Sequence, residues 1–254
     1  MVRLGQNFLA DPNLLDAIVR DAELRKGEVV LEVGLGEGVL SERLAEVVAH
    51  LHGVEIDRRL ESALGGLAAR PNVSLHWGDA MQLDLTALDP APTAVVANLP
   101  YAIATPLILR TIEELPSLER WTVMVQREIA DRLRAPAGSK TYGAPSVLAQ
   151  LACQVQMLRK VDPAVFKPRP RVESAILSLH RIGPAPDAAT RDLVRAAFAH
   201  RRKALARSVE LVRPGSLAAV RVGLEELGLP ADARAESLPP DDFAALSAKL
   251  RQIG

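Results

Sequence analysis

The sequence predicts an α/β fold with a mostly parallel, seven-stranded sheet, followed by a small domain made only of helices. Short apolar runs alternate with helical periodicity through the first part of the chain. A glycine-rich turn follows the first of these runs, as in nucleotide-binding βαβ units. The Pro- and Ala-rich segment 183–189 is typical of a linker, and only helical patterns follow it. We therefore expect two domains, over residues 1–183 and 184–254.

The composition is that of a folded protein without a charge bias. The 254 residues are 48% apolar and 24% charged, with 31 basic and 31 acidic side chains. With a net charge of zero, the chain has no overall excess of positive charge that would indicate nucleic-acid binding, so any basic surface must be local. Cys153 is the only cysteine, which excludes an internal disulfide and a cysteine-built metal cluster. The five histidines show no ligand spacing, and we expect no metal site.

No segment of the sequence is typical of a signal peptide or a membrane span. The first residues lack an apolar core, and the longest apolar tract, 94–109, is interrupted by Asn98, Pro100 and Pro106. We expect a reduced, cytoplasmic, monomeric protein with no membrane partner.

The chain opens with exposed amides before a helix. Asp11 followed by Pro12 is a helix start signal, and apolar residues recur with helical spacing over 14–19. Gln6 and Asn7 precede that helix, either as polar capping groups or as ligand contacts.

The first predicted strand, Glu28–Val33, leads into the turn Gly34-Leu-Gly-Glu-Gly38 and a helix over Val39–Val48. Glycines allow a tight turn and the close approach of a ligand to the free N–H groups at a helix N-terminus. The spacing is G-x-G-x-G and not the G-x-G-x-x-G of dinucleotide sites, so this turn alone does not identify a ligand.

The second predicted strand, 50–55, ends in an acid, and another acid comes after the third predicted strand, 73–77. Glu55 lies 21 positions after the first glycine of the turn, close to the spacing at which an acid meets a ribose hydroxyl. The alternative role, a helix-capping acid, fits Asp57 better. Asp79 follows the third strand directly, where a carboxylate can accept a hydrogen bond from an adenine amino group.

A fourth apolar run, Ala94–Ala97, suits a strand buried on both faces and ends in Asn98-Leu-Pro-Tyr101. An amide oxygen, backbone carbonyls held by a proline and a flat ring suit a planar base that carries an exocyclic amine. The alternative is a polar turn with Tyr101 packed into the core. Carboxyl ends of parallel strands share one edge, so we expect four features to meet there: Gly34, Glu55, Asp79 and Asn98.

The remaining strands complete the predicted sheet. A helix over 104–114, the strand 121–125, a helix over 126–134 and a polar loop over 136–145 follow in order. Extended segments over 148–161 and 175–180 would form a terminal antiparallel pair. Seven strands with such a pair are the architecture of Rossmann-like class I S-adenosylmethionine (SAM) methyltransferases, by analogy of fold.

Two basic segments are candidate RNA contacts. Three cations alternate in the stiff segment after Phe166, which is either a core anchor or a stacking platform for a base. Helical patterns then cover 190–211, 216–227 and 240–250. From residue 187 to 213, seven basic and three acidic side chains give a local charge of +4, either a solvated face or a phosphate contact.

Eight motifs occur in order: GQNFLADPNLL, LEVGLGEGVLSERL, GVEIDRRL, GDAMQLD, NLPYAIATPLIL, VQREIADRL, FKPRPRVESAIL and FAHRRKALARSV. Together they resemble the KsgA family, the bacterial 16S rRNA adenine N6,N6-dimethyltransferases. The similarity runs over almost the whole chain and includes the terminal ESLPPDDFAALSAKL. The chain departs from the usual family pattern at Leu35, Ala102, Ala104 and Ala144-Pro145.

The resemblance implies SAM-dependent dimethylation of two adjacent adenosines near the 3′ end of 16S rRNA during small-subunit biogenesis, without a metal and with S-adenosylhomocysteine as product. For the cofactor it implies Gln6, Asn7, Leu9, Gly34, Gly36, Glu55, Ile56, Asp79, Ala80 and Asn98. For catalysis it implies Asn98, Leu99, Pro100 and Tyr101, with Tyr101 and Phe166 as the aromatic pair around the target base. In the two basic segments, the residues expected to contact RNA are Lys167, Arg169, Arg171, Arg201, Arg202 and Lys203.

The motif that begins at Asn98 suits this chemistry. An adenine amino group is a poor nucleophile because its lone pair is delocalised into the ring. If Asn98 Oδ1 and the Leu99 carbonyl accept its two N–H bonds, the nitrogen can pyramidalise towards a sulfonium methyl group. Positioning and hydrogen bonding then supply the rate, and small Ala102 and Ala104 are compatible with a second transfer.

Three other functions stay open from the sequence. An Erm-type methylase of 23S rRNA is a close alternative, although FAHRRKALARSV and the helical tail favour the small subunit. A non-catalytic assembly or transcription factor on the same fold is disfavoured by the intact Asn98, Pro100 and Tyr101. A nicotinamide dehydrogenase is disfavoured by the glycine spacing.

Overall fold

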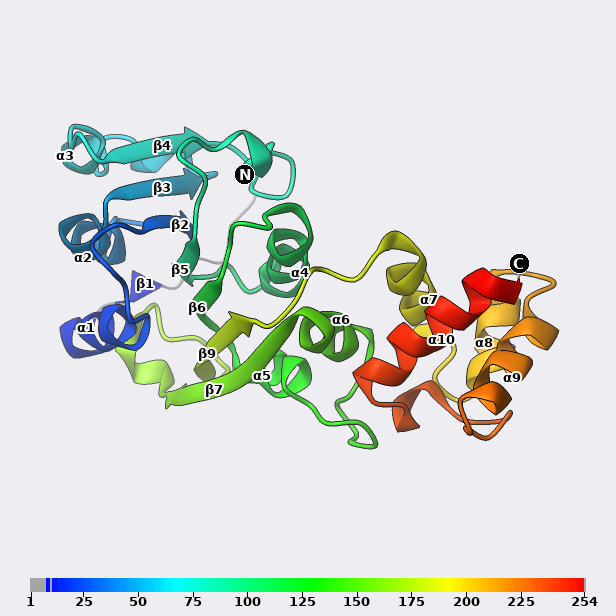
Figure 1. Cartoon of the computed structure of the whole chain (residues 1–254). Coiled ribbons are helices and arrows are strands. Elements are labelled where there is room, and N and C mark those ends of the chain that lie inside the picture. The colour runs from blue at the N-terminus through cyan, green and yellow to red at the C-terminus, as the bar shows by residue number, and fades with distance from the viewer. Residues whose placement is uncertain (1–7, 10, 254) are drawn as a thin grey trace. The chain divides into compact units, whose positions relative to one another are not determined.

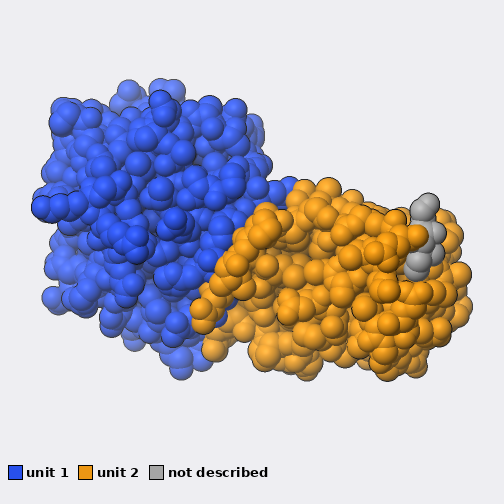
Figure 2. Space-filling view, viewed as in Figure 1, with its two compact units in different colours: residues 1–130, 155–181 blue, residues 131–154, 182–254 orange. Residues whose placement is uncertain are grey.

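The computed structural model describes residues 8–9 and 11–253. Two compact units make up the chain (Figure 2): residues 1–130 with 155–181, and residues 131–154 with 182–254. The second unit therefore takes in 131–154, a segment that lies before the proposed domain boundary at 183/184.

The first unit is built on the predicted seven-stranded, mostly parallel sheet, which the structure confirms (Figure 1). Its strand order is β4-β3-β2-β5-β6-β9-β7; the pairs between β4 and β6 are parallel, and β9 runs antiparallel to β6. The strands are β2 (Val29–Val33), β3 (His50–Glu55), β4 (Val73–Trp77), β5 (Ala94–Asn98), β6 (Arg120–Gln126), β7 (Cys153–Val161) and β9 (Ser174–Arg181).

The strand order reverses between β2 and β5, which lie side by side. Crossovers from these two strands run outwards in opposite directions, so right-handed connections place α2 (Val39–Val47) and α4 (Ala104–Glu114) on opposite faces of the sheet. A crevice at the carboxyl ends of β2 and β5 is the expected result of this topology.

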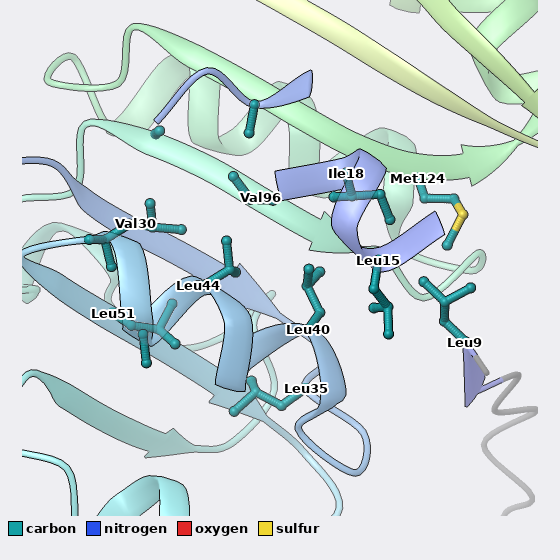
Figure 3. Packing of buried hydrophobic residues seen from close by; sticks show 14 of the residues in the cluster. Leu9, Leu15, Ile18, Val30, Leu35, Leu40, Leu44, Leu51, Val96 and Met124 are labelled. Atoms are coloured by element: carbon teal, nitrogen blue, oxygen red, sulfur yellow. The ribbon is translucent and has the colours of Figure 1, made fainter. Parts of the chain in front are cut away.

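Apolar side chains of the first two helices pack on the central strands (Figure 3). Leu15 and Ile18 from α1 (Pro12–Asp21) and Leu40 and Leu44 from α2 belong to one buried cluster with Val30, Leu51 and Val96. The predicted start of α1 is confirmed, because the Asp11 carboxylate accepts hydrogen bonds from Asn13 N (2.8 Å) and Leu14 N (3.1 Å).

A two-stranded ribbon joins segments far apart in the sequence. β1 (Phe8–Leu9) pairs antiparallel with β8 (Phe166–Lys167). The start of the basic segment that carries Lys167, Arg169 and Arg171 therefore lies beside Phe8 and Leu9. The remaining elements of this part of the chain are α3 (Gly65–Ala68), α5 (Arg127–Leu133) and the 3₁₀ turns Arg58–Leu60, Leu85–Ala87 and Pro163–Val165.

The second unit is helical and has a core that includes three aromatic rings. Tyr142 is buried, donates a hydrogen bond to Leu238 O (2.8 Å) and packs edge-on against Phe198, which stacks on Phe243. The helices are α6 (Ala144–Ala152), α7 (Ala188–Ala199), α8 (Leu205–Val212), α9 (Leu217–Glu226) and α10 (Pro240–Ile253), with a 3₁₀ turn at Ala235–Ser237.

Two secondary-structure predictions were wrong. The predicted strand over 148–161 begins as helix α6, because Pro145 suits a first helical turn and the apolar run 147–149 is buried as part of that helix. The predicted helix over 190–211 is interrupted after Ala199, where His200 N donates to Ser208 Oγ (3.1 Å). The basic residues 201–203 therefore lie on a turn between α7 and α8.

Candidate active site

A cavity of about 460 Å³ opens at the carboxyl ends of the parallel strands. It brings together the four features predicted to share one edge of the sheet, and Leu9, Gly36, Ile56, Ala80 and residues 99–101 also line it. Ala102, one of the departures from the family pattern, lines the cavity too, as does Leu35. Gln6 and Asn7, the other predicted cofactor contacts, lie outside the described residues.

The glycine turn lies directly against the Asn98-Leu-Pro-Tyr101 motif. Gly34 has φ +80°, and its N–H donates to Val54 O (2.9 Å), which ties the turn to β3. A Cβ at this position would lie 3.1 Å from Pro100 Cγ and Cδ. Only glycine therefore combines this left-handed backbone with the close approach of the motif.

Glu55 is held in place by backbone N–H groups. Its Oε2 accepts from Gly36 N (3.0 Å), and its Oε1 accepts from Ile56 N (3.0 Å) and Asp57 N (2.9 Å). A carboxylate accepts about four hydrogen bonds, so Oε2 keeps capacity for one more donor from the cavity. This arrangement fixes an anion at the end of β3 and suits a ribose hydroxyl.

Glu32, which no sequence motif singled out, is a further acid on the cavity wall. It lies on β2, is 1% exposed, and its Oε2 has no hydrogen-bond partner among the described residues. Burial, with the nearby charge of Glu55, raises the pKa of Glu32 to about 8. The available signal was an acid inside an otherwise apolar strand, two residues before the first glycine.

The buried acid makes the stability of the free protein depend on pH. An unfolded glutamate ionises near pH 4.5, whereas Glu32 keeps its proton up to about pH 8 in the fold. Unfolding therefore releases a proton between these values, and the free energy of unfolding falls by about 1.4 kcal/mol per pH unit from this group.

We expect Glu32→Gln to flatten the decline in unfolding free energy between pH 6.5 and 8. Urea unfolding at several pH values measures both slopes, and exposed Glu61→Gln serves as the control that keeps the wild-type slope. Equal slopes for wild type and Glu32→Gln would show that Glu32 is ionised in the folded protein.

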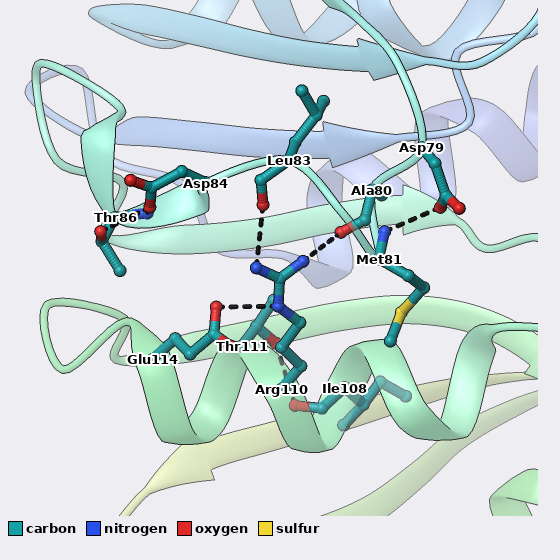
Figure 4. Close-up of polar contacts among 10 residues, drawn as sticks. All are labelled: Asp79, Ala80, Met81, Leu83, Asp84, Thr86, Ile108, Arg110, Thr111 and Glu114. Atoms are coloured by element: carbon teal, nitrogen blue, oxygen red, sulfur yellow. Dashed lines mark hydrogen bonds and ion pairs between the residues drawn. The ribbon is translucent and has the colours of Figure 1, made fainter.

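Asp79 and Ala80 lie where β4 ends, on the cavity wall. The Asp79 carboxylate shapes its own turn: its Oδ1 accepts from Met81 N at 2.8 Å (Figure 4). Its Oδ2 accepts from Gln82 Nε2 at 3.1 Å. The acid is thus held at the cavity edge, in a position from which it can accept a further hydrogen bond.

The Asn98-Leu-Pro-Tyr101 motif is anchored on both sides. Leu99 N donates to Met124 O on β6 (3.1 Å), and Ile103 N donates to Pro100 O (3.1 Å) as α4 begins. The half-buried Tyr101 shares a 2.7 Å hydrogen bond with Ser174 Oγ at the start of β9. Ser174, 73 residues away in the sequence, was missed by sequence reasoning because no local pattern connects it to the motif.

Phe166 lies outside the cavity lining. Its side chain is 2% exposed and belongs to the cluster that contains Leu9, Leu15 and Met124. Of the two predicted roles, the core anchor describes its position here, and the stacking platform does not. The pairing of β8 with β1 provides the reason, since it joins Phe166 to a strand whose Leu9 is also buried.

The six predicted RNA-contacting cations are exposed but lie in different units. Lys167, Arg169 and Arg171 belong to the first unit, where Arg169 approaches Asp162 at 3.7 Å. The other three, Arg201, Arg202 and Lys203, lie on the α7–α8 turn of the second unit.

No helix in the described part of the chain is long and apolar enough to cross a membrane. Within residues 8–9 and 11–253, no three His, Cys, Asp or Glu side chains are grouped so that they could hold a metal ion.

Comparison with known proteins finds similarity to ribosomal RNA methyltransferases over almost the whole chain. The family model described as ribosomal RNA adenine dimethylase matches residues 2–251. A protein of Rubrobacter xylanophilus named ribosomal RNA small subunit methyltransferase A is 46% identical, over 98% of this chain and 94% of its own length. A protein of the same name from Kineococcus radiotolerans is 44% identical, over 96% and 84%.

Two solved structures resemble the chain over almost its whole length. A dimethyladenosine transferase from Plasmodium falciparum has a TM-score of 0.82 at 24% identity, covering 96% of this chain and 98% of that one, and supports the fold alone. The 23S rRNA methyltransferase ErmE has a TM-score of 0.70 at 28% identity, covering 97% of this chain and 100% of its own.

Proposed function

The chain belongs to the ribosomal RNA adenine dimethylase family, and we propose that it uses SAM to dimethylate the N6 amino groups of two adjacent adenosines near the 3′ end of 16S rRNA in the small ribosomal subunit. The observation that carries this proposal is the convergence of a glycine turn, two acids and the Asn98 motif on one cavity. A cytoplasmic monomer acting during subunit biogenesis is part of the same proposal.

The cavity fits SAM in size and charge. Its volume of about 460 Å³ lies within the 300–1,000 Å³ typical of sites for small ligands and cofactors. SAM carries positive charge on its sulfonium and amino groups and supplies an electrophilic methyl group. Glu55 and Asp79 give the cavity wall acidic groups, and the open Glu32 Oε2 can accept a hydrogen bond from the cofactor's ammonium. The ammonium charge would lower the pKa of Glu32 from its raised value in the free protein, so that Glu32 ionises when SAM binds.

The other cofactor contacts follow from the cavity geometry. Glu55 accepts a ribose hydroxyl with the capacity left on Oε2, and Asp79 accepts from the adenine amino group. The glycines at 34 and 36 let the backbone approach the ligand, while Leu9 and Ile56 offer apolar surface. Gln6, Asn7 and Ala80 complete the proposed set.

The target adenine meets the Asn98-Leu-Pro-Tyr101 motif. Asn98 Oδ1 and the Leu99 carbonyl accept the two N6 hydrogens, so that the lone pair localises on nitrogen and points at the methyl group. Tyr101 supports the flipped-out base, and Ser174 fixes the ring that does so. The proton leaves to solvent after transfer, and rotation of the monomethylated amine prepares the second.

Exposed cations supply phosphate contacts for the RNA. We propose this role for the alternating residues of the first unit and for the α7–α8 turn of the second: Lys167, Arg169, Arg171, Arg201, Arg202 and Lys203.

We expect Ser174→Ala to slow methyl transfer about five- to tenfold, because one hydrogen bond worth about 1 kcal/mol no longer holds Tyr101. Single-turnover methylation of undermethylated small subunits measures the rate. Ser178→Ala removes another buried hydroxyl four residues further along β9 and should leave the rate unchanged. A wild-type rate for Ser174→Ala would show that the hydrogen bond between Ser174 and Tyr101 has no part in catalysis.

Transfer of labelled methyl groups from SAM to purified subunits tests which RNA is the substrate. The proposal predicts labelling of undermethylated small subunits and not of large subunits. The similarity to ErmE makes large-subunit labelling the specific alternative, and that result would replace the proposed substrate. Tight SAM binding without transfer to either subunit would indicate a non-catalytic role.

A further inference from the structure

Arg110 lies in the C-terminal half of α4 and holds the turn that carries Asp79. Its Nη1 donates to Ala80 O (2.6 Å) and its Nη2 to Leu83 O (2.8 Å) (Figure 4). On the opposite side Nε donates to Glu114 Oε2 (2.8 Å), one helical turn further along α4. The guanidinium is thus fixed by its own helix and bridges two carbonyls of residues 79–83, called here the 79–83 turn.

This bridge depends on the shape of the arginine head group. The guanidinium is planar and presents several N–H donors in a rigid fork, so one side chain can satisfy two carbonyls at once. A lysine carries the same charge on a flexible stem and has no such fork. Hydrogen bonds from a charged donor are also stronger than those between neutral groups.

The 79–83 turn transmits this constraint to the cavity. Gln82 N (2.8 Å) and Leu83 N (2.9 Å) both donate to Asp79 O, so the turn is closed on itself. Leu83 also packs on Gly78, where an added Cβ would lie 3.1 Å from its side chain. A displacement of Ala80 and Leu83 therefore displaces Asp79, which lines the cavity with Gly78 and Ala80.

The other end of the connection is the catalytic motif. α4 begins at Ala104, directly after Asn98-Leu-Pro-Tyr101, and Leu107 N donates to Ile103 O (2.8 Å) in its first turn. Resting on the proposed function, we propose that Arg110 is a positioning residue that locks the adenine-binding turn of the cofactor site to the helix of the Asn98 motif, and so sets both the affinity and the selectivity for the SAM adenine.

The test compares Arg110→Met and Arg110→Lys with wild type in methylation of undermethylated small subunits. Arg110→Met keeps the length of the side chain and removes the bridge, so the KM for SAM should rise about tenfold while kcat at saturating SAM stays within about twofold. Arg110→Lys should recover part of the loss. Arg70→Met removes the ion pair with Glu42 elsewhere in the first unit and should change neither constant.

The preference for SAM over an analogue distinguishes the proposed role of Arg110 from a general loss of stability. An analogue of SAM with a 6-oxo group in place of the 6-amino group lacks the donor that Asp79 accepts. Wild type should prefer SAM over this analogue, and Arg110→Met should lose much of that preference. Combining Arg110→Met with Asp79→Ala should add little to the loss caused by Asp79→Ala alone, because both changes remove the same contact.

An unchanged KM and an unchanged preference in Arg110→Met would overturn this inference and leave the proposed function intact. Failure of the wild-type protein to bind SAM or methylate either subunit would instead overturn the proposed function. A fall in kcat alone, with KM and preference at wild-type values, would place Arg110 outside the cofactor site.

Discussion

Replacing Asn98 by alanine should nearly abolish methyl transfer while the protein still folds and binds SAM. The side-chain oxygen, at the end of β5, is one of two proposed acceptors for the N6 hydrogens. Removal of one preorganised polar contact to a reacting group costs about 10²- to 10³-fold in kcat, and we expect a loss of this size. Pre-steady-state methylation of undermethylated small subunits measures it.

Two comparisons separate this effect from misfolding or loss of cofactor. Asn98→Asp keeps an acceptor oxygen at the same position and should recover part of the rate. Calorimetry with S-adenosylhomocysteine should show a Kd that changes less than about tenfold in Asn98→Ala, the cost of one hydrogen bond. A wild-type rate in Asn98→Ala would exclude the proposed role of the amide.

Replacing Gly34 by alanine should impair the cofactor site and the catalytic motif together. The backbone at φ +80° costs an L-residue about 1–2 kcal/mol. The new Cβ would also press on Pro100 Cγ and Cδ, 3.1 Å away, and displace the motif. Because a shift of about 1 Å can cost 10²-fold in rate, we expect kcat/KM for SAM to fall about 100-fold.

Two other glycines separate the effect of the left-handed backbone from the effect of the contact with Pro100. Gly27→Ala places its Cβ in open space without a left-handed backbone and should change neither stability nor activity. In Gly228→Ala the new Cβ also lies in open space, but the backbone has φ +71°. This variant should therefore be less stable than wild type and keep the wild-type kcat/KM. If Gly34→Ala matches Gly228→Ala in both measurements, the contact with Pro100 has no part in function.

The sheet and the placement of its functional edge could be predicted because they follow from local patterns. The central strands β2, β5 and β6 are short, largely apolar runs, and parallel strands bring their carboxyl ends to one edge whatever their order. That rule alone was enough to bring Gly34, Glu55, Asp79 and Asn98 to a common edge, where the structure has its cavity.

The features that could not be predicted depend on partners distant in the sequence. Ser174 reaches Tyr101 across 73 positions, and Arg110 reaches the 79–83 turn across 27 to 30. The sequence left two roles open for Phe166, and the pairing of β8 with β1 that buries it is a contact that a two-residue strand does not signal. The protonated state of Glu32 likewise requires the buried wall around it.

Errors in secondary structure had local physical causes. The short apolar run before Cys153 suits a helix or a strand equally well, and the packing of α6 against α7 and α10 decides for the helix. The break after Ala199 depends on the Ser208 hydroxyl, which donates to Ala196 O (2.6 Å) and accepts from His200 N. Residues 200–204 contain no glycine or proline that would predict the end of a helix there.

Nucleoside analysis of small subunits after reaction with SAM is the decisive experiment for adenine dimethylation by this protein. Undermethylated subunits are incubated with protein and labelled SAM, and their 16S rRNA is digested and separated by mass spectrometry. We expect the label to be recovered as N6,N6-dimethyladenosine, at two neighbouring positions near the 3′ end. Label in any other nucleoside, or no label in RNA although SAM is bound, would show that the protein does not dimethylate adenine.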